Sequence, residues 1–342
     1  MPVAACNRIL TLQLTAHAIM KSEASIFVSI ACLDDPDIVL TIADLYEKAS
    51  VPQRIFVGAC LQIDPNDPSY QELGGFDNVR VDTIHFNEAR GPIYARYRCE
   101  QLLEDEDYYL QIDCHSRFFP GWDEILIEEF KRCQQQSGQA VISHYPINIS
   151  NMGKQEVLAN IGQVNRFRQI DQDAIKSHGS LIRLPEAPLP SIGISAAMLF
   201  IEGATKKRIP FDPNLHFGLH AAEQVLYAVR LWTHGFDIFA PTRHTLATQY
   251  EGSRDRIPED VKKALNSNRR DWPQKTWSKT KYLLGLDTLE QVDPAYRNEL
   301  ESDAFPYGLG SARSLLDYYR FSGIHEKLKE IFPNYKFRDV AD

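Results

Sequence analysis

Long apolar segments are missing from this chain of 342 residues. None approaches the roughly 18 consecutive apolar residues that a membrane-spanning helix needs. The amino-terminal segment is only mildly apolar, is broken by Asn7, Gln13 and His17, and lacks the basic start of a signal peptide. These absences predict a cytoplasmic protein with no membrane span.

An excess of positive charge is missing as well. The 46 Asp and Glu residues outnumber the 37 Lys and Arg residues, which gives a formal net charge of -9. A protein whose main partner is nucleic acid needs a basic face to neutralise phosphates. Because charges of both signs are mixed along the chain without a long like-charge run, we expect no nucleic-acid partner.

The chain also lacks paired cysteines. Its 6 cysteines form neither a C-x-x-C pair nor a zinc-ligand spacing. A disulfide framework is therefore not expected, and cysteines within predicted strands or helices should pack as small apolar groups. Cys114 alternates away from its two polar neighbours if the strand geometry persists, so we expect it to be buried.

Short β-rich apolar segments alternate with helical patterns along the first half of the chain. Strands are expected at 26–32, 54–60, 79–84, 108–112 and 140–145, and helices near 37–49, 92–104 and 122–136. This alternation is typical of an α/β fold with an open, mostly parallel, Rossmann-like sheet flanked by helices.

Residues 146–190 break this pattern, because they are rich in Asn, Gln and Gly and end in Leu-Pro-Glu-Ala-Pro-Leu-Pro. They predict a long loop, which in a compact domain is usually functional. A further strand is expected at 191–201. Its Gly193 would let a ligand approach the backbone closely, although small residues in strands are also ordinary packing.

Two polar residues follow the strand predicted at 108–112. Asp113 and His115 are spaced two apart, so a carboxylate and an imidazole lie where they can hold one divalent ion at the carboxyl end of a strand. The alternative is that Asp113 caps the following turn and His115 is a surface histidine.

Two arginines lie near the start of the helix predicted at 92–104. The helix opens with Gly91 and Pro92, which suits the first helical position. Arg90 and Arg96 could therefore face an anion together with the backbone N–H groups of the helix start. An anion site beside a cation site indicates a metal-bound diphosphate, as nucleotide-sugar chemistry requires.

Five segments carry a resemblance to a known family, and they occur in the order 51–58, 88–97, 108–124, 230–242 and 307–324. They read V-P-Q-R-I-F-V-G, E-A-R-G-P-I-Y-A-R-Y, Y-Y-L-Q-I-D-C-H-S-R-F-F-P-G-W-D-E, R-L-W-T-H-G-F-D-I-F-A-P-T and Y-G-L-G-S-A-R-S-L-L-D-Y-Y-R-F-S-G-I. The chain resembles the cytoplasmic hydroxyproline-directed N-acetylglucosaminyltransferases, which are distant relatives of the mucin-type polypeptide N-acetylgalactosaminyltransferases. The resemblance implies a GT-A fold, a nucleotide-sugar donor, a divalent metal and retaining transfer.

The resemblance also assigns roles to residues. Asp113 and His115 match the D-x-H metal ligands, and Arg96, with Arg90 behind it, would bind the uridine or phosphate end of the donor. Glu223 in Ala222-Glu223-Gln224 matches a carboxylate that contacts sugar or acceptor, although Ala222 replaces the glycine of relatives. The alternative for Glu223 is a solvated acid at a helix start.

The third metal ligand is where the chain departs from the family. Relatives place a histidine just ahead of an aromatic residue, where this chain has Thr248-Gln249-Tyr250. His244 could take over through a shifted loop, or the ion could keep Asp113 and His115 with water and diphosphate oxygens. Weakened metal binding is a third alternative.

Together these observations predict an amino-terminal segment at 1–23, a GT-A catalytic domain at 24–250 and a helical extension at 251–342. The predicted enzyme uses Mn²⁺ or Mg²⁺ to move a sugar, most readily N-acetylglucosamine from its uridine diphosphate donor, to a hydroxyl of a protein or small acceptor. Two rivals remain, namely a catalytically impaired relative that binds a nucleotide-sugar or a protein partner, and a metal-dependent hydrolase of phosphorylated compounds.

Overall fold

The computed structural model describes residues 24–171, 174–218, 221–252, 257–302 and 304–325. The predicted amino-terminal segment at 1–23 and the last residues of the predicted extension lie outside these ranges. Within them, the helices are too short or too polar to cross a bilayer.

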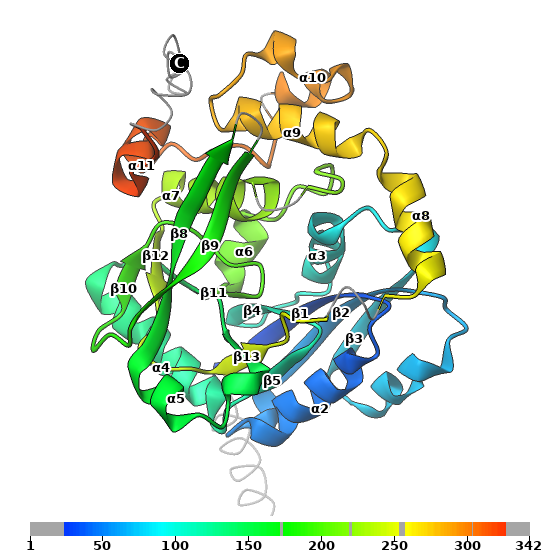
Figure 1. The fold of residues 1–342 in the computed structure, drawn as a ribbon, viewed down its shortest axis with the longest axis vertical. Coiled ribbons are helices and arrows are strands. Elements are labelled where there is room, and N and C mark those ends of the chain that lie inside the picture. Colours follow the sequence, from blue (N-terminus) through cyan, green and yellow to red (C-terminus); the bar gives the residue numbers. More distant parts are fainter. Residues whose placement is uncertain (1–23, 172–173, 219–220, 253–256, 303, 326–342) are drawn as a thin grey trace, which may run out of the picture.

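An eight-stranded sheet forms the centre of the molecule, with the order β10-β12-β6-β11-β4-β1-β2-β3 (Figure 1). The strands are β1 (Ile26–Leu33), β2 (Ile55–Ile63), β3 (Val79–His85), β4 (Tyr108–Asp113), β6 (Ala140–Ser143), β10 (Leu189–Ser191), β11 (Met198–Glu202) and β12 (Asp237–Ala240). β1 to β4 pair in parallel, whereas β11 runs antiparallel to both of its neighbours. The sheet is therefore mixed but mostly parallel, as predicted.

Helices cover both faces of this sheet because its strands are apolar on both sides. Residues of α2 (Asp37–Lys48) and α4 (Trp122–Gln136) share one buried cluster with Val28 and Ile30. Residues of α3 (Pro92–Glu100) and α7 (Leu226–Thr233) share another with Phe27, which points to the opposite face. The early strands and helices thus lie close to their predicted positions.

The prediction of a long loop at 146–190 is wrong. This region contains α5 (Gln155–Asn160) and a hairpin of β8 (Ile161–Asp171) and β9 (Ala174–Arg183). The polar residues of β8 and β9 make this segment look like a loop in the sequence, although some of them form hydrogen bonds to buried backbone groups. Asn165, for example, is fully buried and donates from Nδ2 to the carbonyl oxygens of Ser143 and Gly193, at 3.2 and 2.6 Å. The strand expected at 191–201 is also wrong in its bounds, since Ser191 ends β10 and β11 begins only at Met198.

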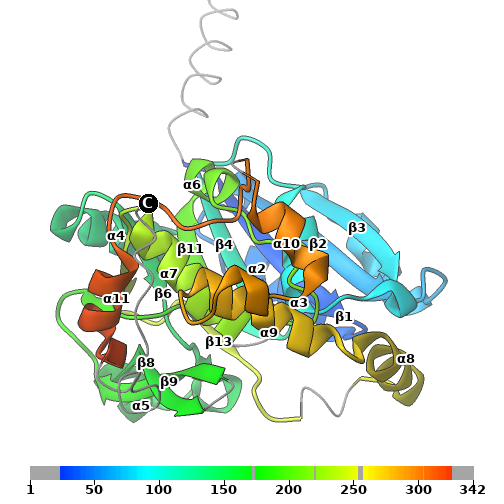
Figure 2. The same ribbon diagram turned by 90° about the horizontal axis from the view of Figure 1, so that it is seen from above.

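A three-stranded sheet joins β5 (Ser116–Phe118), β13 (Leu246–Thr248) and β7 (Ile147–Asn148) beside the main one. Helices α8 (Glu259–Arg269), α9 (Trp272–Leu283), α10 (Pro294–Leu300) and α11 (Leu315–Ser322) follow. Figure 2 shows α9 overlying α3 and α7 when the molecule is seen from above, and α9 contacts the turn Ala221–Val225 that leads into α7. Leu283 of α9 and Tyr318 of α11 belong to the same buried cluster as α7, so these two helices extend the core on that face of the sheet.

Candidate active site

A cavity of about 440 Å³ opens at the carboxyl ends of β1, β2 and β4. This is the edge at which open α/β sheets bind their ligands. The helix α8 and the segment before it close one side of the cavity. The lining residues are Ala31, Leu33, Asp35, Gln62, Gly91, Pro92, Arg96, Asp113, Cys114, His115, Phe217, Ile257, Lys262, Leu265, Asn266 and Arg269.

Asp113 and His115 both line this cavity, on either side of the end of β4. Two hydrogen bonds of one side chain hold the turn that carries them. Thr41 on α2 donates its hydroxyl to the carbonyl oxygen of Cys114 at 2.7 Å and accepts from the backbone N–H of Ser116 at 3.0 Å. Cys114 between them is buried in the core on the α2 side, as predicted.

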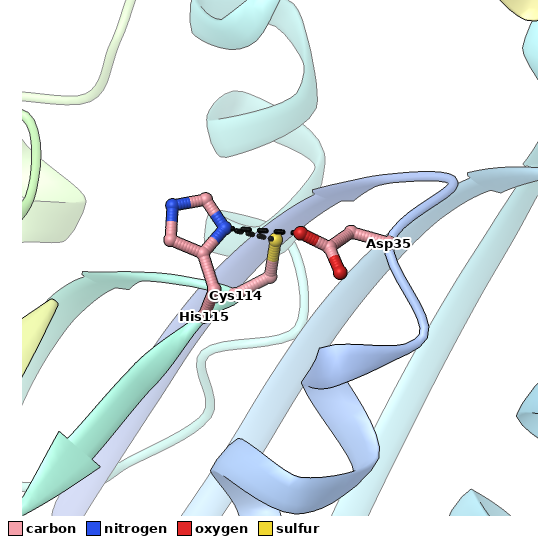
Figure 3. A group of neighbouring side chains, drawn as sticks. All are labelled: Asp35, Cys114 and His115. Carbon is pink, nitrogen blue, oxygen red and sulfur yellow. Dashed lines mark hydrogen bonds and ion pairs between the residues drawn. The ribbon is translucent and has the colours of Figure 1, made fainter. Parts of the chain in front are cut away.

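The imidazole of His115 is bonded to a carboxylate that the sequence did not single out. Its Nδ1 atom lies 3.1 Å from Oδ2 of Asp35 and 3.6 Å from Sγ of Cys114 (Figure 3). Burial alone would lower the pKa of His115, but Asp35 and Cys114 outweigh it and raise that pKa to about 10. Charged His115 cannot bind a metal, so an ion at this ring must displace a proton.

Arg96 extends from α3 into the space between two carboxylates. Its Nη2 lies 3.5 Å from Oδ1 of Asp113, and its Nη1 contacts Oε1 of Glu223. Desolvation lowers the pKa of Arg96, while Asp113 opposes that shift. Arg96 thus connects Glu223 to the cavity that Asp113 and His115 line.

Glu223 lies on a π-helical turn, Ala221–Val225, which continues into α7. Its side chain is only 6% exposed, and it is not among the residues that line the cavity. The adjacent Gln224 accepts a hydrogen bond from the hydroxyl of Tyr145 at 2.8 Å. Such turns often occur at functional sites, and this one fixes Glu223 against Arg96.

Two of the proposed donor-binding residues lie outside the cavity lining. Arg90 is exposed and stacks over the ring of Tyr94, with 5.0 Å from its guanidinium carbon to the ring centroid. Gly193 is buried against the hairpin, where an added Cβ would meet Asn165 at 3.7 Å. Gly193 therefore contacts protein at the point where a sugar was expected.

The start of α3 nevertheless shapes the cavity through Gly91. This glycine has a φ of 93°, and a Cβ there would lie 2.7 Å from the Cα of Phe217. The backbone N–H of Phe217 donates to the carbonyl oxygen of Arg90 at 2.7 Å. Only glycine fits this close approach, which places Phe217 in the cavity wall.

The structure separates the two candidates for a third metal ligand. His244 does not line the cavity, and its Nε2 lies 2.8 Å from the carbonyl oxygen of Ile161. Gln249 is not among the lining residues either, but its backbone N–H donates to the carbonyl oxygen of His115 at 3.1 Å. The Gln249 side chain donates to the carbonyl oxygen of Glu251 at 3.0 Å.

The side chains around the cavity offer two possible sets of ligands for a divalent ion. Asp113 and His115 offer one oxygen and one nitrogen, and the remaining positions are open to ligand oxygens, which suits Mn²⁺ or Mg²⁺. Asp35, Cys114 and His115 also place three potential ligand atoms within 4.8 Å of one another. That second set contains a thiol, which Mn²⁺ and Mg²⁺ do not favour.

Sequence reasoning missed several residues of this cavity. Asp35 lies two residues after the end of β1, and Gln62 is the polar residue next to the end of the apolar strand β2. Their positions at strand ends could have marked both residues as candidates for the site. Gln62 is buried, and its Oε1 has no hydrogen-bond partner among the described residues. Lys262 and Arg269 arrive from α8, and nothing in their local sequence indicates that they reach this edge.

Comparison with solved structures identifies similar folds. The chain superposes on GalNAc-T7, solved with UDP, GalNAc and Mn²⁺, with a TM-score of 0.54 and 14% identity. That match covers 92% of this chain and 59% of GalNAc-T7, so the chain spans less than two thirds of that protein. S. aureus TarS 1-349, solved with UDP-GlcNAc, gives a TM-score of 0.46 and 12% identity over 90% of this chain and 76% of that one.

Comparison at the sequence level identifies the family. No curated protein sequence matches the chain. The family model described as glycosyltransferase (GlcNAc) matches residues 25–76 and 70–327, which is most of the chain and includes every residue of the cavity. The mixed α/β sheet flanked by helices agrees with that assignment. The chain therefore belongs to the GlcNAc glycosyltransferase family.

Proposed function

We propose that this glycosyltransferase is metal-dependent and retaining, and that it moves N-acetylglucosamine from UDP-N-acetylglucosamine to a hydroxyl of a protein or small acceptor. The observation that carries the proposal is the convergence of Asp113, His115 and Arg96 on one cavity at the carboxyl edge of the sheet. GalNAc-T7, which shares the fold, was solved with UDP, GalNAc and Mn²⁺. The sequence resemblance favours a hydroxyproline hydroxyl as the acceptor.

Asp113 and the Nε2 atom of His115 would hold the Mn²⁺ or Mg²⁺ ion. When bound, such an ion neutralises the charge that develops on the leaving diphosphate. Arg96 supplies a fixed positive charge next to Asp113, and its burial removes competing water. Lys262 and Arg269 line the other side of the cavity and would bind further phosphate oxygens.

Gln62 is suited to recognise the base of the donor. Gln62 lines the cavity, its Nε2 donates to the carbonyl oxygen of Cys32 at 3.3 Å, and its Oε1 is a buried acceptor without a hydrogen-bond partner among the described residues, which a rotation of the amide toward the cavity would present to the base. Uracil offers an N–H donor at N3, whereas cytosine offers an acceptor at the same position. A buried acceptor left unpaired costs about 1–3 kcal/mol, so Gln62 favours a uracil nucleotide.

The carboxylates support retention. Among the described residues that line the cavity, the carboxylates are Asp35 and Asp113. Asp35 is hydrogen-bonded to His115, and Asp113 is hydrogen-bonded to Arg96. Glu223 is likewise engaged by Arg96. An inverting enzyme needs a free general base on the face opposite the leaving group, whereas in a front-face transfer the leaving phosphate oxygen takes the acceptor proton.

Donor turnover tests the proposal. UDP release from a panel of nucleotide-sugars should be highest for UDP-N-acetylglucosamine and should require Mn²⁺ or Mg²⁺. Asp113→Asn and His115→Ala should each abolish metal-stimulated release without a large loss of stability, since both side chains lie at a strand end. A metal-independent wild type, or full activity in either variant, contradicts the assigned site.

The anomer of the first product tests the mechanism separately. An α-linked donor should give an α-linked product by NMR, and a β-linked product would contradict retention. Tight donor binding without any transfer would instead favour a catalytically impaired relative, for which Thr248 and Gln249 at the position of the family histidine provide a reason.

A further inference from the structure

Asp35 contacts both a helix start and the proposed metal ligand. Its Oδ1 accepts from the backbone N–H of Asp37 at 3.1 Å, at the start of α2, and its Oδ2 lies 3.1 Å from Nδ1 of His115. The side chain is only 6% exposed. Each carboxylate oxygen therefore has a defined partner within the protein.

Rigid elements hold both ends of this contact. The carbonyl oxygen of Asp35 accepts from the Cys32 thiol at 3.3 Å. Residues on either side of His115 are bonded to the Thr41 hydroxyl. Figure 3 shows the second ring nitrogen of His115 pointing away from Asp35 and Cys114.

We propose that Asp35 is a positioning residue that keeps a proton on Nδ1 of His115 and so presents Nε2 to the divalent ion. This inference rests on the proposed function, because it takes His115 as a metal ligand. Histidines that bind metals usually donate their other N–H to a carboxylate or carbonyl, which fixes the tautomer and the ring orientation. Nothing in the D-x-H sequence itself indicates that partner.

The competing arrangement places the ion between Asp35, Cys114 and Nδ1 of His115. Two observations oppose it for Mn²⁺ or Mg²⁺. The Nδ1 atom is already at hydrogen-bond distance from Oδ2 of Asp35, and Cys114, although it lines the cavity, belongs to the buried cluster that includes residues of α2. A thiol is also a poor ligand for these hard ions.

The informative variant is Asp35→Asn. Asparagine caps a helix start about as well as aspartate, so Oδ1 can still accept from Asp37. The amide NH₂ group would replace Oδ2 and donate to Nδ1 of His115, which moves the ring proton to Nε2 and blocks the metal. We expect Mn²⁺ affinity, measured by EPR of the free ion, to fall by about 10- to 100-fold with little change in melting temperature.

Asp34→Asn is the matched control for the loss of one negative charge. Asp34 is the adjacent residue and accepts from the hydroxyl of Tyr70 at 2.9 Å instead of contacting His115. Its φ of 44° is a conformation that asparagine tolerates. Cys114→Ala removes the thiol and so tests the competing arrangement, and both controls should bind Mn²⁺ much as the wild type does.

The outcomes separate this inference from the proposed function. Raising Mn²⁺ should restore turnover in Asp35→Asn, which a merely structural defect would not allow. Proton competition weakens as the pH rises, so the loss of Mn²⁺ affinity in Asp35→Asn should be present at both pH 7 and pH 8.5 if it comes from the wrong ring tautomer. Wild-type affinity in Asp35→Asn, an equal loss in Asp34→Asn, or an equal loss in Cys114→Ala would each overturn the role of Asp35. A wild type that binds no Mn²⁺ would overturn the proposed metal site itself.

Discussion

Arg96 and Glu223 form an ion pair in which both side chains are only 6% exposed. The sequence suggested separate roles for them, with Arg96 on the donor and Glu223 on the sugar or acceptor. Their contact joins the two roles, because Glu223 lies behind Arg96 and fixes the guanidinium that faces Asp113. We therefore propose that Glu223 acts on the donor through Arg96.

Arg96→Ala should weaken donor binding and destabilise the fold together. A charge-assisted bond to phosphate contributes roughly 1.5–3 kcal/mol, so the dissociation constant for UDP should rise about 10- to 100-fold. Leaving Glu223 buried without its partner should cost about 3–5 kcal/mol of unfolding free energy. Calorimetry with UDP and chemical denaturation measure the two effects.

Arg98→Ala is the control for Arg96→Ala. Arg98 lies on the same helix but pairs with Asp82, away from the cavity lining, at 2.7 Å from Nη2 to Oδ1. Its removal should leave UDP affinity unchanged. An equal loss of affinity in both variants would contradict a specific role for Arg96.

Glu223→Gln distinguishes support of Arg96 from contact with the sugar. If Glu223 acts through Arg96, the substitution should lower UDP affinity as well as turnover, because Arg96 loses its charged partner. UDP lacks the sugar, so its affinity is insensitive to any direct sugar contact. Unchanged UDP affinity with reduced transfer would show that Glu223 contacts the sugar or acceptor instead.

The parallel core was predictable because its signal is local. Strands β1, β2 and β4 are short, mostly apolar segments, β3 alternates apolar and polar residues, and Asp113 and His115 lie at the end of β4. The hairpin of β8 and β9 was missed because apolar and polar residues alternate only weakly there, and because asparagine, as at the buried Asn165, is typical of loops. The contact of Asp35 with His115 spans 80 residues and depends on two turns meeting, which no local pattern encodes.

The acid sensitivity of the fold should depend on His144. Burial, with a smaller contribution from nearby His244, lowers the pKa of His144 from 6.5 to about 3. The unfolded chain therefore binds more protons than the folded protein between these values, so stability falls as the pH decreases through that window. The slope for one such histidine reaches about 1.4 kcal/mol per pH unit.

His144→Gln should reduce the pH dependence of the unfolding free energy between pH 6.5 and pH 5 by the contribution of one histidine. Most carboxylates titrate below this range. His216, whose pKa burial lowers to about 4, would keep its own contribution in both proteins. Urea denaturation at several pH values gives the measurement. An identical pH dependence in the variant and the wild type would show that His144 is not neutral in the folded state.

Gln249→His should strengthen metal binding, because Gln249 occupies the position that the structure brings next to the proposed site. Its backbone N–H is bonded to the carbonyl oxygen of His115, while the imidazole of His244 is engaged with Ile161. A histidine at 249, just ahead of Tyr250, would restore the order found in the relatives that the sequence resembles. We expect the Mn²⁺ dissociation constant to fall by about tenfold, or roughly 1.4 kcal/mol. His244→Ala should leave that dissociation constant unchanged. If His244→Ala instead loses much of its Mn²⁺ affinity and Gln249→His gains none, the third ligand would be His244.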